Sequence, residues 1–271
     1  AAQFSAWGWR VAYLIGAVAG IIIFALRAFI PESIEFEQSK IKAKQHHKEI
    51  MTPRSLKSAL SQYWSTILVI AGVFALASTT DVFISLYFPQ YIHQYFAIPL
   101  ISSWTLTIIV VFVGILSTIA FGALSDRVDR KKLLMLAASC FLLLSFPLLS
   151  LLSLGQWHIA LITAVLFCII LSMYEGPLPA LMVKLPPVKV RYTIFSLGYN
   201  ITSALFGGSS PLICSLLGRV SPLAPAFYFM TLAVLALIVL YFIGKRGKVE
   251  AQPEPEPIIT PQPSESIPQT N

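Results

Sequence analysis

The feature that most constrains this chain is a succession of long apolar runs. Five runs of about 20 residues are obvious in the sequence, and two more become apparent on inspection. A helix advances about 1.5 Å per residue, so each run can cross the roughly 30 Å hydrocarbon core of a bilayer. The sequence lacks the alternating segments of about 10 residues that are typical of membrane barrels. Backbone in lipid must satisfy its own hydrogen bonds, so the runs are predicted to be helices.

Composition supports the same class. Hydrophobic residues make up 56% of the 271 residues and charged residues only 11%, whereas soluble domains carry about 25% charged residues. The net charge of +7 does not indicate a nucleic-acid-binding domain, because the cations lie between the apolar runs. We therefore expect an all-α polytopic membrane protein with seven transmembrane helices. They are predicted at residues 11–30, 65–88, 101–123, 133–153, 157–181, 192–217 and 223–244.

Lysine and arginine predict the orientation. All but Arg10 and Arg219 of the 19 cations fall on one side of the predicted membrane. Cytoplasmic loops are enriched in these residues, so this side and the C-terminus are expected in the cytoplasm, and the N-terminus outside. The odd number of helices and the alanine at position 1 lead us to expect a fragment or truncated form of a longer protein.

Two carboxyl groups lie within predicted helices, Asp81 and Glu175. A charge at mid-bilayer costs at least about 2.5–3.5 kcal/mol, so such an acid usually faces the bundle interior, is paired or is protonated. Asp81 is predicted in the outer third of the membrane and Glu175 near its cytoplasmic side, so direct pairing is not expected. We interpret them as candidates for proton coupling or gating. The alternative is that each side chain snorkels to water or caps a broken helix.

The helix predicted at 192–217 carries polar residues on one face. Their i, i+4, i+7 and i+11 spacing predicts a face that looks into a cavity, unless it is a plain packing face. The candidates are Tyr192, Ser196, Tyr199 and Ser203, with Asn200 at the shoulder. Further along, Gly207, Gly208 and Pro211 predict a kink and close helix packing.

Other kinds of chemistry find no support in the sequence. Cys140, Cys168 and Cys214 all lie inside predicted helices without the spacing of a metal site, and are expected to be buried thiols. No phosphate-binding glycine loop indicates an ATP-driven pump, and no serine, histidine and acid form a catalytic arrangement. We therefore predict that the protein is not an enzyme and holds no cofactor or metal.

The segment FGALSDRVDRKKLL, residues 121–134, lies between two predicted helices. Its glycine permits close helix approach, and Asp126 can pair with Arg127 or Arg130. We interpret it as a charged latch at the cytoplasmic surface. The members of this latch are Gly122, Ser125, Asp126, Arg127, Arg130 and Lys131. Its pattern G-x-x-S-D-R-x-x-R-K resembles the loop signature of the major facilitator superfamily, although Asp129 stands where that signature usually has glycine.

Three further stretches resemble one family within this superfamily, the metabolite:proton symporters of the proline/betaine transporter type. They are WGWRVAYLIGAVAGIIIFALRAFIPES at 7–33, GPLPALMVKLPPVKVRYT at 176–193, and YN at 199–200 with FGGSSP at 206–211. The chain departs from its relatives at Lys184, where they commonly have an acid. Together with the loop signature, these stretches cover most of the chain.

The resemblance implies a domain organisation. Residues 1–30 would be the last helix of the N-terminal bundle and 31–64 the cytoplasmic central loop. Residues 65–245 would form the complete C-terminal six-helix bundle, and the proline-rich residues 246–271 a disordered cytoplasmic tail. The N-terminal half of the transporter would be the missing partner of this bundle.

The resemblance also implies a function. The protein would be a proton symporter for a small polar metabolite or osmolyte such as proline or betaine, in the bacterial inner membrane. Two alternatives stay open, a non-transporting remnant or membrane scaffold, and a symporter for dicarboxylates or other organic acids. The sequence does not distinguish these substrates, and it leaves the coupling stoichiometry and the oligomeric state open.

Overall fold

The computed structural model describes residues 7–27, 56–188 and 190–246, and every regular element in these ranges is helical. Six described spans are long and apolar enough to cross a membrane, so the predicted all-α membrane fold is confirmed. These spans are Ser61–Phe96, Leu100–Leu124, Arg130–Leu154, Trp157–Met182, Arg191–Val220 and Ala224–Ile243. The helix predicted at 11–30 corresponds to α1, Trp9–Arg27, whose apolar part Tyr13–Arg27 is shorter than the others.

The predicted loop and tail lie largely outside the described residues. Within the predicted loop at 31–64, the structure describes only the residues from Leu56, which already belong to helix α3. The tail predicted at 246–271 is described only at its first residue. The domain boundaries proposed from the sequence therefore stay predictions.

The chain divides into two compact units, Ala1–Ile67 with Val183–Leu197, and Leu68–Met182 with Gly198–Asn271. The first unit contains α1, the beginning of α3 (Leu56–Val82) and the beginning of α9 (Arg191–Thr202). Within it, α3 bends at Tyr63, whose φ of −116° and ψ of 19° are not helical.

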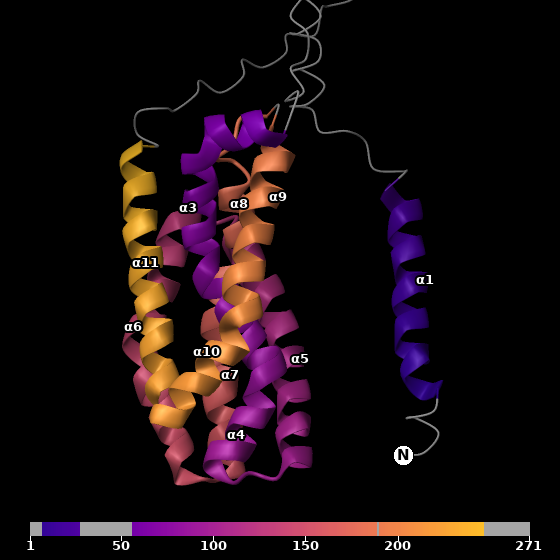
Figure 1. Cartoon of the computed structure of the whole chain (residues 1–271), viewed down its shortest axis with the longest axis vertical. Helices are drawn as coiled ribbons and strands as arrows, with labels where there is room; N and C mark the ends of the chain where they lie inside the picture. Colours follow the sequence, from indigo (N-terminus) through magenta and orange to yellow (C-terminus); the bar gives the residue numbers. More distant parts are fainter. Residues whose placement is uncertain (1–6, 28–55, 189, 247–271) are drawn as a thin grey trace, which may run out of the picture. The chain divides into compact units, whose positions relative to one another are not determined.

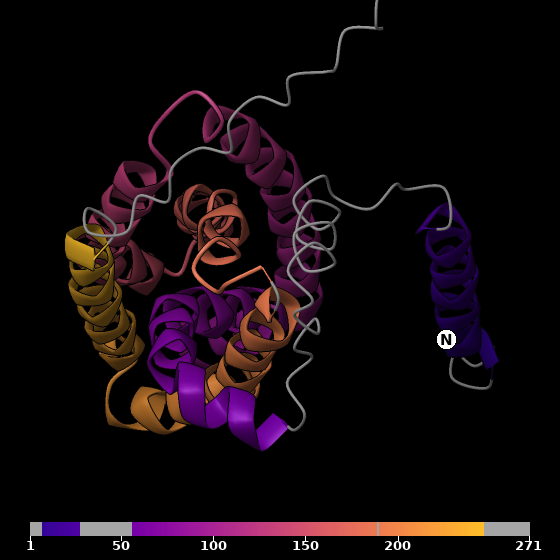
Figure 2. The same cartoon turned by 90° about the horizontal axis from the view of Figure 1, so that it is seen from above.

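The second unit holds most of the transmembrane helices, which run side by side (Figure 1). Helix α7 packs against α5 and α6 and lies between them in the end-on view (Figure 2). Helix α11 packs against α6 and α10, and α4 packs against α5. The helices that begin in this unit are α4 (Phe88–Phe96), α5 (Leu100–Leu124), α6 (Arg130–Leu151), α7 (Trp157–Glu175), α8 (Leu178–Met182), α10 (Gly208–Val220) and α11 (Ala224–Arg246).

Two π-helical turns lie in the second unit. One turn, η2 at Phe83–Tyr87, joins α3 to α4, and the other, η4 at Ser203–Gly207, joins α9 to α10. Such turns are rare and commonly occur at functional sites. Pro211 has no N–H to donate to the carbonyl of Gly207, four residues earlier, which favours irregular backbone there. The sequence predicted a kink in this region, and the structure places a π-helical turn there.

Small residues allow α5 and α7 to approach closely. A Cβ atom on Gly114 of α5 would lie 2.8 Å from the Cys168 Sγ atom of α7. One turn further along, the Ser172 hydroxyl donates a hydrogen bond of 3.2 Å to the Gly114 carbonyl. Cys168 and Cys214 are buried, Cys140 is half-buried, and all three are free thiols.

Candidate functional site

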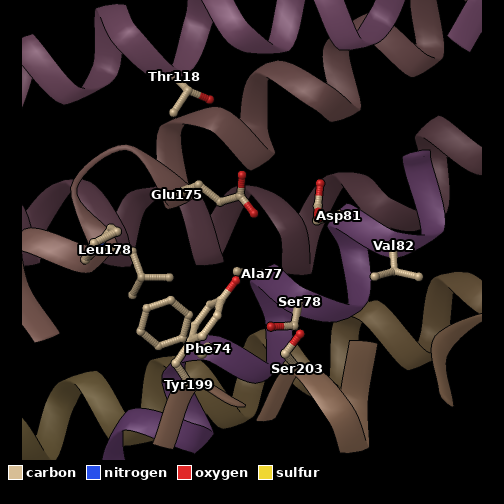
Figure 3. A pocket seen from close by; sticks show the side chains of 11 residues that line it. Phe74, Ala77, Ser78, Asp81, Val82, Thr118, Glu175, Leu178, Tyr199 and Ser203 are labelled. Carbon is tan, nitrogen blue, oxygen red and sulfur yellow. The ribbon is translucent and has the colours of Figure 1, made fainter. Parts of the chain in front are cut away.

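A cavity of about 360 Å³ lies within the second unit. Its walls come from α3, α5, α7, α8, α9 and the π-helical turn η4, so segments far apart in the sequence meet here (Figure 3). The lining residues are Phe74, Ala77, Ser78, Asp81, Val82, Thr118, Glu175, Leu178, Pro179, Tyr199 and Ser203.

Asp81 is held at the end of α3, directly before the turn η2. The Ser85 hydroxyl donates a hydrogen bond of 2.7 Å to the Asp81 backbone carbonyl, which helps to hold this irregular segment. The Asp81 carboxyl group is turned into the cavity (Figure 3).

Glu175 is the last residue of α7 and is half-buried. Its neighbour Tyr174 is fully buried and donates a hydrogen bond of 2.8 Å to the Val73 carbonyl of α3. This bond joins the two helices that carry the carboxyl groups. On the other side, Gly176 lies so close to Gly122 that a Cβ atom would be 2.8 Å from the Gly122 nitrogen.

The two carboxyl groups therefore line the same cavity, although the sequence predicted them in opposite leaflets. The observed span that carries Asp81 is longer than the helix predicted at 65–88. It runs from Ser61 to Phe96 through η2, so Asp81 lies near its middle and not in its outer third. A second cavity of about 360 Å³, bordered by Cys168 and Ser172, is also lined by both Asp81 and Glu175.

The charged side chains that line these two cavities are acidic. Both carboxyl groups border both cavities, and among the residues that the structure describes no lysine, arginine or histidine lines either of them. A carboxyl group in such a setting is available to a proton or to a cation, because no cationic side chain of the wall neutralises it.

Of the five predicted cavity-facing residues, Tyr199 and Ser203 line the cavity. The Tyr199 ring meets the Phe74 ring edge to face, with centroids 5.2 Å apart and an interplanar angle of 83°. Asn200 is exposed and is not among the lining residues. Tyr192 and Ser196 belong to the first unit, where Tyr192 is 83% exposed and Ser196 half-buried.

Several residues that line the cavity were not predicted from the sequence. Phe74, Ser78 and Asp81 share one face of α3 at i, i+4 and i+7, a spacing that would have revealed them if it had been followed back from the acid. Thr118 of α5 and Leu178 of α8 come from elements whose apolar sequence holds no comparable signal.

The segment 121–134 is ordered by local hydrogen bonds. The Ser125 hydroxyl donates to the Gly122 carbonyl at 2.7 Å, and Arg130 forms an ion pair of 2.7 Å with Asp126. Asp129 caps α6, because its carboxylate accepts from the backbone N–H of Lys131 at 2.9 Å. Its φ of −56° requires no glycine, so the aspartate fits the turn without strain.

The other members of this segment lie at its surface. Asp126 and Arg127 are exposed, and Lys131 is half-buried. Asp126 therefore faces water, where an ion pair contributes little to stability, typically about 0–1 kcal/mol.

The glycines at 207 and 208 differ in their surroundings. A Cβ atom on Gly207 would lie 3.4 Å from the Ser78 carbonyl of α3, so η4 approaches α3 closely at this point. A Cβ atom on Gly208 would meet only the Ser203 carbonyl, at 3.9 Å. Ser210 completes the contact with a hydrogen bond of 2.8 Å to the Thr79 carbonyl.

Among the described residues, no group of three or more histidine, cysteine, aspartate or glutamate side chains is placed to hold a metal ion.

Comparison of the sequence with known proteins agrees with the all-α membrane fold. The sequence profile described as Major Facilitator Superfamily matches residues 1–197. A citrate-proton symporter of Klebsiella pneumoniae is 28% identical over 253 residues, which cover 92% of this chain and 55% of that protein. A proline/betaine transporter of Staphylococcus aureus (strain COL) is 26% identical over 243 residues, which cover 89% and 51%. The chain thus spans about half the length of the relatives it matches.

Proposed function

Because the chain belongs to the major facilitator superfamily, we propose that it acts in proton-coupled secondary transport of a small polar metabolite or osmolyte, such as proline or betaine. Secondary transporters bind solute near the bilayer midplane and expose the site to each side in turn. The chain is a multi-pass integral membrane protein, and the relatives it matches are transporters and not enzymes.

The observation that carries this proposal is the pair of carboxyl groups on one intramembrane cavity. Ionisable side chains within a membrane are expensive to insert, so they commonly mark proton relays or ion pathways. Asp81 and Glu175 lie on different helices and border the same two cavities. We assign them the proton-carrying or gating role, with Tyr199 and Ser203 in contact with the solute.

The proposed architecture places residues 65–245 in one six-helix bundle and residues 1–30 in the last helix of another. Residues 31–64 would connect them, and residues 246–271 would form a cytoplasmic tail. A second bundle would supply the opposite wall of the solute pathway. The distribution of lysine and arginine in the sequence supports a C-terminus in the cytoplasm. The location we propose is the bacterial inner membrane, which agrees with the bacterial relatives.

A second candidate solute class is supported by the comparisons. The relative from Klebsiella pneumoniae is named a citrate-proton symporter and is 28% identical to this chain. A symporter for organic acids is therefore the competing proposal, and it predicts uptake of citrate or a dicarboxylate in place of a neutral osmolyte.

The test is uptake of radiolabelled solutes by cells that express the protein from its complete gene. The panel contains proline, betaine, citrate, a dicarboxylate and a sugar, each with and without a protonophore. We expect accumulation of one of these solutes and its loss when the proton gradient collapses. Uptake of none of them, or accumulation that the protonophore leaves unchanged, would contradict the proposal.

A further inference from the structure

We infer that the cavity bordered by Asp81 and Glu175 binds the cationic end of its solute, so that the solute is a small zwitterion or monocation with an ammonium group and not a polyanion. This inference rests on the proposed transport function and narrows its solute class. It distinguishes between the two kinds of solute for which the relatives are named.

The first support is the charge of the wall. Asp81 and Glu175 border the cavity, and no cationic side chain of the described residues lines it. A solute with several carboxylates would approach these acids with like charge, and like charges repel strongly where water is scarce. An ammonium group would instead be attracted to the same two side chains.

The second support is the aromatic pair on the opposite side of the cavity. Figure 3 shows the Phe74 and Tyr199 rings across from the two carboxyl groups. The rings meet edge to face at 5.2 Å, and the Tyr199 side chain is 42% exposed. The face of an aromatic ring attracts cations, and quaternary ammonium groups bind in such settings because they cannot donate hydrogen bonds.

The third support is the polar remainder of the wall. Ser78 and Ser203 place hydroxyl groups at the cavity beside the aromatic pair (Figure 3). A hydroxyl can donate a hydrogen bond to a carboxylate. A zwitterion thus finds a partner for each of its charges, the acids for its ammonium group and the hydroxyls for its carboxylate.

Charge balance connects this site to coupling. One proton on the carboxyl pair leaves one negative charge, and one ammonium group neutralises it. With a monocation bound, the assembly of carboxyl pair, proton and solute is neutral, whereas the carboxylate of a zwitterion leaves one negative charge. In both cases the proton removes one negative charge from the assembly, which lowers the cost of moving it through the membrane. This favours joint transport of proton and solute over transport of the solute alone.

The test is equilibrium binding of radiolabelled betaine to purified protein expressed from its complete gene, with choline, proline and citrate as unlabelled competitors. We expect choline and proline to displace betaine and citrate to leave it bound. Asp81→Asn and Glu175→Gln should each weaken binding by about tenfold or more, the effect of losing a charged partner. Tyr199→Ala should weaken binding more than Tyr199→Phe, because phenylalanine keeps the ring face.

Asp129→Asn is the matched control, because it removes a carboxylate outside the cavity and asparagine can still cap α6. Size-exclusion chromatography verifies that each variant is folded. Binding of citrate without betaine, binding of neither by folded protein, or equal affinities for Tyr199→Ala and Tyr199→Phe would overturn the inference. Betaine binding without proton-driven accumulation would instead overturn the proposed function and leave the cation site standing.

Discussion

At Gly176 the end of α7 lies against the backbone of α5 with no room for a side chain. A Cβ atom there would be 2.8 Å from the Gly122 nitrogen and 3.1 Å from the Phe121 carbonyl carbon. Both obstacles are backbone atoms, which cannot rotate away as the end of a side chain can. This contact sets the position of Glu175, because the glutamate is the residue immediately before the glycine.

We therefore predict that Gly176→Ala destabilises the protein by about 1–3 kcal/mol, the usual cost of overpacking. Gly208→Ala is the matched control, because its new Cβ would have only one neighbour, at 3.9 Å. Thermal unfolding of the purified protein in detergent measures both. Equal melting temperatures for the two variants would show that α5 and α7 can separate without cost.

The carboxyl groups of Asp81 and Glu175 are predicted to act in proton coupling rather than in stability. Asp81→Asn and Glu175→Gln remove the charge and keep the size of each side chain. We expect each to reduce proton-driven accumulation by about a hundredfold or more, the lower end of the range for positioned acid–base groups. Exchange of labelled for unlabelled solute across the membrane, measured at saturating solute so that weaker binding is overcome, should be reduced less. Equal loss of both activities, or no loss, would exclude these residues as coupling groups.

At the scale of elements, α6 begins at an N-cap, Asp129, where the signature of the superfamily usually has glycine. Asp129 accepts hydrogen bonds from the backbone N–H groups of Lys131 and Lys132, at 2.9 and 3.4 Å. The carboxylate also interacts favourably with the positive end of the helix dipole.

We predict that Asp129→Ala destabilises the protein by about 1 kcal/mol, whereas Asp129→Gly costs only a few tenths. Urea or thermal unfolding of detergent-solubilised protein distinguishes the two. If glycine at this position proved more stable than aspartate, the cap would not contribute and the turn would prefer the glycine of the family signature.

The positions of the long helices could be predicted because they depend on length and hydropathy alone. The run at 101–123 became α5, Leu100–Leu124, and the run at 157–181 became the span Trp157–Met182. The span predicted at 65–88 was too short, because the observed span runs from Ser61 to Phe96. Its polar end, with His93 and Gln94, reads as a helix end in the sequence, but α4 continues through it to Phe96.

The candidate site could be predicted in part. Asp81 and Glu175 stand out because charge within a membrane is costly, and Tyr199 stands out by its spacing on a polar face. Their meeting in one cavity depends on how α3, α7 and α9 pack, which the sequence does not express. Phe74 is an aromatic residue in an apolar helix, and only its spacing from Ser78 and Asp81 indicates that it faces the cavity.

At the scale of the whole molecule, the segment 121–134 is proposed to act as a latch between conformations. Arg130 already pairs with Asp126 within the segment, whereas the neighbouring Arg127 is exposed. An exposed cation beside such a pair is available to a partner elsewhere in the transporter.

We predict that Arg127→Ala lowers the transport rate by severalfold without lowering the amount of protein in the membrane, because a surface cation contributes little to stability. Western blotting of membranes and initial uptake rates measure the two effects separately. Loss of the protein itself would assign Arg127 a structural role, and an unchanged rate would exclude it from the latch.

The central claim is that solute and proton move together through the cavity bordered by Asp81 and Glu175. The most direct measurement uses proteoliposomes that contain the protein expressed from its complete gene and a pH-sensitive dye inside. An inward gradient of betaine should acidify the lumen, and Asp81→Asn or Glu175→Gln should abolish the acidification. Entry of labelled betaine or citrate without any change in lumenal pH would contradict the account.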